Sequence, residues 1–83
     1  MSDGIDERLS EVFQVVFELP ADTDMAAMRQ VTIRAWDSLG HVSLVTALES
    51  EFEIEISAVD SIEITSYEAA RLLVAELVDE QAQ

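Results

Sequence analysis

Apolar residues recur every three or four positions in three stretches of the chain, at about residues 4–17, 38–53 and 66–79. This spacing places them along one face of an α-helix, with polar residues on the opposite face. The apolar positions that define the three faces are Ile5, Leu9, Val12, Phe13, Val16, Leu44, Val45, Leu48, Phe52, Leu72, Leu73, Leu77 and Val78. The pattern predicts three main helices whose apolar faces pack against one another.

The segments between these helices carry loop signals. Residues 18–36 contain Pro20 and two aspartates, Asp22 and Asp24, which predict a long loop. We expect one helical turn within residues 25–34, with Met28 and Ile33 turned inward. Residues 53–57 alternate as a strand would, but no second strand is available to pair with them. We therefore predict that the preceding helix ends there in a loop.

Two capping patterns precede the last two helices. Ser57 and Asp60 are spaced as a capping pair before a short helix, predicted over about residues 58–62. Thr65 and Glu68 match a capping box, in which each side chain accepts from the other residue's amide. The elements together predict an all-α fold, a single domain over residues 1–83 built as a bundle of three main helices plus one short helix.

The composition fits such a bundle and limits its location. Apolar residues make up 49% of the chain but aromatic residues only 6%, so we expect a core of Leu, Val, Ile and Ala. There is no cysteine, and hence neither a disulfide nor a thiolate metal site. The acidic N-terminal segment does not resemble a signal peptide, and no apolar run approaches the roughly 20 residues of a membrane span. We expect a cytoplasmic monomer.

Charge narrows the choice of partners. Eighteen acidic residues face four arginines, and the formal net charge is −14. Nucleic acids and anionic membrane surfaces both require a basic footprint, so neither is an expected partner. An acidic surface instead favours encounters with proteins that carry basic patches.

The start of the second predicted helix carries a conspicuous serine. Asp37 is placed to act as the N-cap, accepting hydrogen bonds from amides of the first turn. Ser38 would then be the first helical residue, exposed at the positive end of the helix dipole. A phosphate ester on its hydroxyl would be stabilised there. Taken alone, this local pattern more often marks a simple helix cap.

The stretch "DSLGHVSLVTALESEFEIEIS", residues 37–57, resembles the phosphopantetheine attachment region of acyl carrier proteins. In that family an Asp-Ser-Leu triplet opens the second helix and is followed by a hydrophobic stripe, an acidic run and a phenylalanine. The triplet here is Asp37-Ser38-Leu39, and Phe52 closes the pattern. The resemblance is specific from Trp36 to about Leu73, and it implies an acyl-carrier-like bundle.

This resemblance implies a modified carrier without catalytic activity or a bound metal. Ser38, between Asp37 and Leu39, would receive 4′-phosphopantetheine from coenzyme A through a separate, magnesium-dependent phosphopantetheinyl transferase. The arm would carry an acyl group as a thioester to partner enzymes of a fatty-acid, polyketide or specialised acyl pathway. The resemblance also implies a set that docks onto basic patches of those enzymes and a set that lines an interior for the acyl chain. The docking set is Leu39, Val42, Thr46 and Glu49, and the interior set is Leu44, Leu48, Phe52 and Ile56.

The sequence departs from the usual fatty-acid carrier at several positions. Gly40 and His41 follow the triplet where acidic or small polar residues are common, and Ser43 and Ser50 stand where glutamate is common. Trp36, before the triplet, is more typical of stand-alone, specialised carriers. These departures favour a dedicated pathway. Two alternatives stay open: an aminoacyl carrier of the D-alanyl or peptidyl type, and an acidic helical interaction module without a prosthetic group.

Two other chemistries are disfavoured by the residues themselves. Asp37, Ser38 and His41 could suggest a hydrolytic triad, but all three come from one helical turn with no separate oxyanion donors. We expect His41 to be a solvent-exposed helix residue and Trp36 to be a packing residue between the loop and the helix. The acidic residues 22–24 lack the glycine and the final glutamate of a calcium loop.

Overall fold

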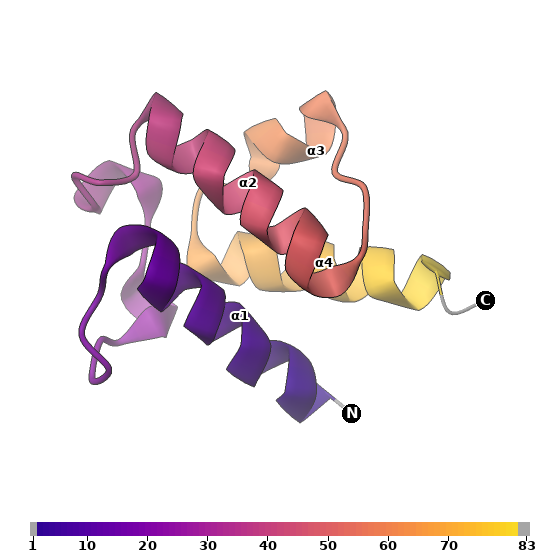
Figure 1. Cartoon of the computed structure of the whole chain (residues 1–83), viewed down its shortest axis with the longest axis horizontal. Coiled ribbons are helices and arrows are strands. Elements are labelled where there is room, and N and C mark those ends of the chain that lie inside the picture. Colours follow the sequence, from indigo (N-terminus) through magenta and orange to yellow (C-terminus); the bar gives the residue numbers. More distant parts are fainter. Residues whose placement is uncertain (1, 82–83) are drawn as a thin grey trace.

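The computed structural model describes residues 2–81, so residues 1, 82 and 83 of the predicted domain lie outside it. The described part contains four α-helices and two 3₁₀ turns, and three of the helices are long (Figure 1), which confirms the predicted all-α class. The elements are α1 (Ser2–Phe17), η1 (Met25–Ala27), η2 (Gln30–Thr32), α2 (Ser38–Phe52), α3 (Ala58–Glu63) and α4 (Tyr67–Gln81).

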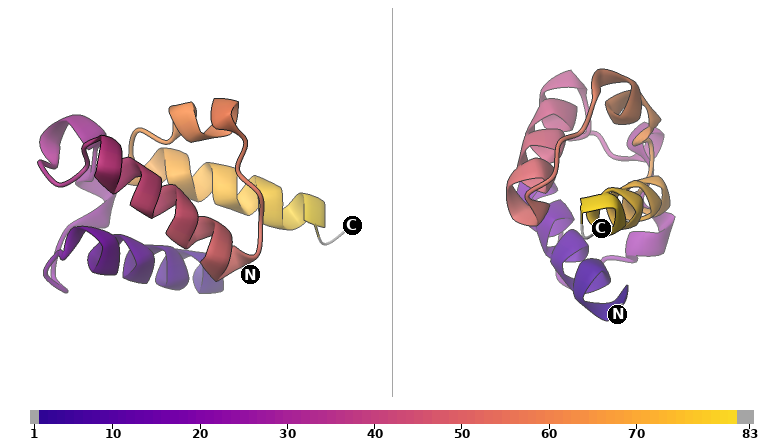
Figure 2. Two further views of the ribbon diagram at one scale, coloured as in Figure 1. Left: turned by 45° about the horizontal axis from the view of Figure 1, so that its top comes forward. Right: turned by 90° about the vertical axis from the view of Figure 1, so that its right-hand side faces the viewer.

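The three long helices pack around a common core. Helix α1 runs opposite to α2 and α4 and packs against both (Figure 1). The short helix α3 lies beside α2 and α4, on the side away from α1 (Figure 2). The loop between α1 and α2 closes one end of the bundle, where Met28 and Ile33 pack against the core as expected. That loop ends next to the start of α2, which presents the candidate site.

The buried face of α4 matches the predicted one only in part. The faces of α1 and α2 lie where the apolar pattern places them, with Leu9, Phe13, Leu44 and Leu48 fully buried. On α4, Leu73, Leu77 and Val78 are partly buried and pack against the core as predicted. Leu72 is exposed, however, and the buried residues are Tyr67, Ala70 and Val74. These three share one helix face at i, i+3 and i+7, but only one of them is a large aliphatic residue. The prediction was based on the positions of the leucines, and it did not include Ala70.

Aromatic packing joins the loop to the helices. Four of the five aromatic residues gather in one cluster, with Phe13 at its centre. The Phe13 ring meets Phe17, Trp36 and Tyr67 edge-on, at centroid distances of 5.8, 5.5 and 5.1 Å. Edge-to-face pairs of this kind stabilise a core beyond the area they bury. Trp36 is almost fully buried, which confirms its predicted packing role.

The chain between α2 and α3 follows the prediction. Helix α2 ends at Phe52, and Glu53 adopts the left-handed conformation that terminates many helices, with φ 54° and ψ 50°. Residues 54–57 are irregular rather than a strand. Ser57 then caps α3, because its Oγ accepts a hydrogen bond from the Asp60 amide at 3.1 Å.

The predicted capping box before α4 is wrong by one residue. The N-cap of α4 is Ser66, whose Oγ accepts from the Ala69 amide at 3.0 Å. Thr65 is used differently: its carbonyl accepts from the Gln30 amide at 2.9 Å, tying the loop to the start of α4. The Glu68 carboxylate pairs with Arg71 instead of reaching back to a cap, and this hydrogen bond lowers its pKa.

Candidate functional site

Asp37 and the first residues of α2 form the N-terminus that the sequence predicts. The Asp37 carboxylate accepts from the Gly40 amide at 2.9 Å, and its carbonyl accepts from the His41 amide at 2.8 Å. Helix α2 therefore begins at Ser38. Ser38 is exposed, as are Asp37 and Leu39. The amides of Ser38 and Leu39 lie in the first turn of the helix, where an N–H group has no carbonyl acceptor within the helix. The Ser38 hydroxyl is thus accessible beside unpaired helix donors.

Gly40 is required by the way the loop meets the helix. A Cβ atom at this position would lie 2.0 Å from the Ala35 carbonyl oxygen and 3.3 Å from Cε1 of Phe17. The loop backbone therefore presses directly against the first turn of α2. Glycine at this position therefore allows the loop to pack this closely against α2.

His41 is half-buried and hydrogen-bonded, so the prediction of a solvent-exposed residue is wrong. Its Nδ1 accepts from the Trp36 indole N–H at 3.0 Å, and the two rings are stacked. An indole nitrogen can only donate, so Nδ1 is unprotonated and the ring proton is on Nε2. Nε2 then donates to the Ser61 carbonyl at 2.8 Å and lies 3.1 Å from its Oγ. We call this contact of Trp36, His41 and Ser61 the His41 clasp.

The His41 clasp also bears on the hydrolase interpretation. A catalytic base must present a nitrogen to the nucleophile. Both ring nitrogens of His41 are instead occupied by Trp36 and Ser61. The clasp joins the start of α2 to α3 and to the loop, and so contributes to holding Ser38 in place. The arrangement argues for a structural histidine.

The first three turns of α2 are uncharged in an otherwise strongly acidic chain. Residues 38–48 contain neither an acidic residue nor an arginine, although the whole chain carries 18 acidic residues. We call residues 37–48 the head of α2 and residues 49–56 its tail. A phosphate attached to Ser38 would meet one neighbouring carboxylate in this segment, that of Asp37, which is already engaged with the Gly40 amide. The head therefore fits an anionic group on Ser38.

The residues of the predicted docking set lie at both ends of the helix. Leu39, Val42 and Thr46 are exposed on the head. Glu49 is half-buried, and its Oε2 accepts from the Ile56 amide at 2.8 Å. This hydrogen bond fastens the loop after α2 to the helix, so the Glu49 carboxylate has a partner within the fold.

The four residues of the predicted interior set are all buried. Leu44 and Leu48 are inaccessible to solvent, and Phe52 and Ile56 are nearly so. They belong to one hydrophobic core shared with α1 and α4. The structure thus places these side chains together, while their contact with an acyl chain stays a prediction.

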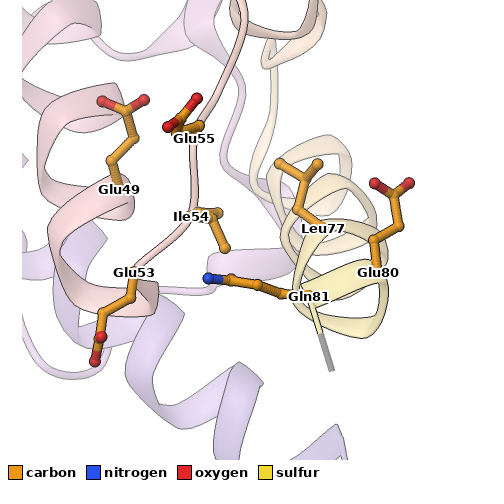
Figure 3. Close-up of a pocket in the computed structure, with 7 residues that line it drawn as sticks. All are labelled: Glu49, Glu53, Ile54, Glu55, Leu77, Glu80 and Gln81. Carbon is orange, nitrogen blue, oxygen red and sulfur yellow. The ribbon is translucent and has the colours of Figure 1, made fainter. Parts of the chain in front are cut away.

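The tail of α2 is rich in carboxylates that make contacts within the fold. Glu51 forms an ion pair with Arg8, at 2.8 Å from Nε, and the Arg8 guanidinium lies over the Phe52 ring at 4.7 Å from its centroid. Beside the tail, an open hollow of about 560 Å³ separates it from the end of α4 (Figure 3). Its lining residues are Glu49, Glu53, Ile54, Glu55, Leu77, Glu80 and Gln81.

This hollow does not suit the predicted prosthetic group or a metal ion. Four of its seven lining residues are glutamates, which repel a phosphate, and it lies at the far end of α2 from Ser38. The glutamate side chains point in different directions (Figure 3). Among the residues that the structure describes, no group of acidic or histidine side chains is arranged to hold a metal ion. Asp24, from the acidic run in the loop, accepts from the Ala26 amide and caps η1.

No helix within residues 2–81 has the length and the apolar run that crossing a lipid bilayer requires. The sequence predicts the cap at Asp37 and the helix start at Ser38, which the structure confirms, but it predicts neither the role of Gly40 nor the His41 clasp. The five-residue spacing of Trp36 and His41 was a weak signal for their contact. The sequence held no signal for Ser61, because its contact depends on where α3 packs.

Comparison with known proteins identifies the fold. No model of a known protein family matches the sequence, and no curated protein matches it significantly. The structure matches the solution NMR structure of a holo acyl carrier protein from Geobacter metallireducens with a TM-score of 0.80. The match covers 94% of this chain and 88% of that chain, at 23% sequence identity. The chain therefore has the fold of an acyl carrier protein.

Proposed function

We propose that this chain is an acyl carrier protein whose Ser38 carries a covalent 4′-phosphopantetheine arm. The observation that carries the proposal is the placement of Ser38: an exposed hydroxyl at the first position of α2, with Asp37 as the cap. The Asp-Ser-Leu triplet and the fold shared with a holo acyl carrier protein support the same role. The chain acts as a carrier, and separate enzymes perform the chemistry.

The residues around Ser38 fit the attachment of a phosphate-linked arm. The amides of Ser38 and Leu39 and the positive end of the helix dipole favour a negative charge at this position. Asp37 fixes the direction of the first turn, and the uncharged head adds no further repulsion. The thiol of the arm supplies the position at which an acyl group is held as a thioester. The protein has no cysteine of its own that could compete for the acyl group.

The proposed partners are a phosphopantetheinyl transferase and enzymes that load or use the acyl group. Both must approach Ser38, and Leu39, Val42 and Thr46 are the residues of the predicted docking set that are exposed near it along α2. We assign these three to partner contact, and we assign Glu49 to the hydrogen bond with Ile56. The net charge of −14 would speed encounters with partners that carry basic surfaces.

The core favours an acyl cargo over an aminoacyl cargo. Leu44, Leu48, Phe52 and Ile56 offer an apolar interior in which a hydrocarbon chain would be stabilised. These side chains are buried in the core, so a hydrocarbon chain could enter only if the helices moved apart. Helix α3 has no buried side chain and can move with the smallest loss of apolar contact. An amino acid would gain little from this interior.

The proposal is tested by modifying the protein and weighing it. The chain is incubated with coenzyme A, magnesium and a broad-specificity phosphopantetheinyl transferase, and its intact mass is measured. We expect a gain of one phosphopantetheine on the parent chain and none on Ser38→Ala. Ser43→Ala is the matched control, because Ser43 is also an exposed serine on α2. It should be modified as fully as the parent.

Two results would contradict the proposal. If the parent gained no mass while a known carrier was modified in the same mixture, the chain would be an acidic helical module. If Ser38→Ala gained the same mass as the parent, the arm would be attached to a different residue.

A further inference from the structure

Helix α3 contributes no buried side chain to the core, unlike the three long helices. Its apolar anchors lie just outside it: Ile56 precedes its cap, Ile64 follows its last residue, and both are buried. Between these anchors, the hydrogen bonds that join α3 to α2 in the described part of the chain are those from His41 to Ser61. His41 therefore holds the body of α3 against α2.

The His41 clasp is fixed on its other side by the core. Trp36 is almost fully buried, with its ring edge-on to Phe13 and stacked on Phe17. Its indole N–H donates to Nδ1 of His41 at 3.0 Å, which leaves the ring proton on Nε2. Nε2 directs this proton to the Ser61 carbonyl at 2.8 Å. A buried partner thus sets the orientation of the imidazole, and the imidazole in turn holds α3.

A hydrocarbon chain can reach the interior set with the least disruption by displacing α3. Moving α1 or α4 away would expose fully buried residues such as Phe13 and Val74, whereas α3 has no buried side chain to expose. Helix α3 lies on the side of α2 and α4 away from α1 (Figure 2), so its displacement leaves the packing of α1 against both helices intact. Such a local opening costs less than global unfolding. The hydrogen bonds from His41 to Ser61 must break when α3 leaves α2.

We propose that the His41 clasp is a latch on α3 that determines how readily an acyl chain carried on Ser38 enters the core. The inference rests on the carrier function proposed above and adds a regulatory element to it. A cargo is sheltered only if the apolar contacts that it gains exceed the hydrogen bonds that its entry breaks. Because the gain grows with each buried methylene, the latch discriminates against short acyl groups. His41 is a positioning residue in this account, since it acts through α3.

The first test follows the latch in the unmodified protein by hydrogen exchange of α3. The observed amides are those of Ser61 and Ile64, which donate to the carbonyls of Ser57 and Ser61. His41→Phe keeps a ring beside Trp36 and removes the hydrogen bonds of the clasp. We expect both amides to exchange about tenfold faster in this variant, because α3 opens more often.

Tyr67→Phe is the matched control for this exchange experiment. It also keeps an aromatic ring, and it loses the hydrogen bond from the Tyr67 hydroxyl to the Asp6 carbonyl, 3.2 Å long, between α4 and α1. Exchange of the α3 amides should stay within about twofold of the parent in this variant, since α3 opens locally. Unchanged exchange in His41→Phe would overturn the proposal. Equally faster exchange in Tyr67→Phe would overturn it too, because general loss of stability would then explain the effect.

The second test measures the effect of the latch on cargo. A butyryl or an octanoyl arm is attached to Ser38 by supplying the transferase with the acyl coenzyme A, and the melting temperatures are compared. We expect the octanoyl protein to melt above the butyryl protein, and this increment to be about 4–8 °C larger in His41→Phe than in the parent. Tyr67→Phe should show the increment of the parent. The same increment in all three proteins would overturn the role of the latch in cargo entry.

Failure of the carrier function gives a different result from failure of the latch. A parent chain that accepts no phosphopantetheine would refute the carrier function, and with it any effect on cargo, even if α3 exchanged faster in His41→Phe. A parent that is modified, with α3 exchange unchanged in His41→Phe, would refute the latch alone.

Discussion

The two ends of α2 differ in the residues they carry: one end exposes apolar side chains, and the other carries carboxylates. At the head, residues 38–48 are uncharged, and apolar side chains such as Leu39 and Val42 face solvent next to Ser38. At the tail, two of the four glutamates have partners within the fold: the Glu49 carboxylate accepts a hydrogen bond from the Ile56 amide, and Glu51 pairs with Arg8. The end that presents the serine therefore leaves its apolar groups available, and the other end uses its charges for structure.

This difference changes how the acidity of the chain should be interpreted. A net charge of −14 suggests that carboxylates make the contacts with partners. The structure places the acidic residues of α2 at its tail, about 15 Å or more along the helix from Ser38 at 1.5 Å per residue. Charge at that distance can steer an approaching partner, but it cannot contact the reacting group. Global charge and local docking chemistry are thus separate properties of this molecule.

The largest expected loss of stability comes from replacing Trp36, whose buried ring packs against His41 in the head of α2. Trp36→Ala removes a buried ring in contact with Phe13, Phe17 and His41, and should cost about 3–5 kcal/mol. A domain of this size has a total stability of only about 4–12 kcal/mol. We expect chemical denaturation to show a protein close to unfolding. Trp36→Phe keeps a ring and should lose about 1–3 kcal/mol; equal losses for both would mean that the packing of the ring contributes nothing.

The next largest loss of stability is expected from replacing Gly40. Gly40→Ala places a Cβ atom 2.0 Å from the Ala35 carbonyl oxygen, so the loop or the helix must shift. This strain outweighs the better helix propensity of alanine, and we expect a loss of about 1–3 kcal/mol in the free energy of unfolding. Gly4→Ala on α1 is the control, because a Cβ atom there has no neighbour within 4 Å. It should be neutral or stabilising by up to about 1 kcal/mol. A similar loss in both variants would contradict the close approach at Gly40.

The smallest expected loss of stability comes from a substitution in the tail of α2. Glu49→Gln replaces a charged acceptor of the Ile56 amide by a neutral one, and should lose about 0.5–1.5 kcal/mol. Glu53→Gln removes the same charge from an exposed residue of the same tail. Any relief of self-repulsion is common to both, so their difference in urea denaturation isolates the hydrogen bond. No difference between them would leave the Glu49 carboxylate without a structural role.

Much of this fold could be predicted because its signals are local. The caps at Asp37 and Ser57 and the apolar faces of α1 and α2 depend on residues within a few positions of each other. The predictions from sequence are wrong where a contact with a distant segment of the chain determines the local structure. The loop bonds to the backbone around Thr65, and this contact moved the cap of α4 to Ser66.

The candidate site shows the same division. The cap at Asp37 and the helix start at Ser38 could be predicted locally, whereas the prediction of Ser38 as the attachment site depends on the resemblance of residues 37–57 to a known family. His41 was misplaced as an exposed residue, since its burial depends on the loop on one side and α3 on the other.

One paired measurement tests the contrast between the two ends of α2 most directly. Leu39→Gln with Val42→Gln alters the head, and Glu49→Gln with Glu51→Gln alters the tail; the free energy of unfolding and the rate of phosphopantetheine transfer are measured for both. We predict that the head variant keeps its stability and loses about tenfold in transfer, whereas the tail variant loses about 1–2 kcal/mol and keeps its transfer rate. A tail variant that stayed stable but lost transfer would contradict the account, because partners would then recognise the carboxylates of the tail.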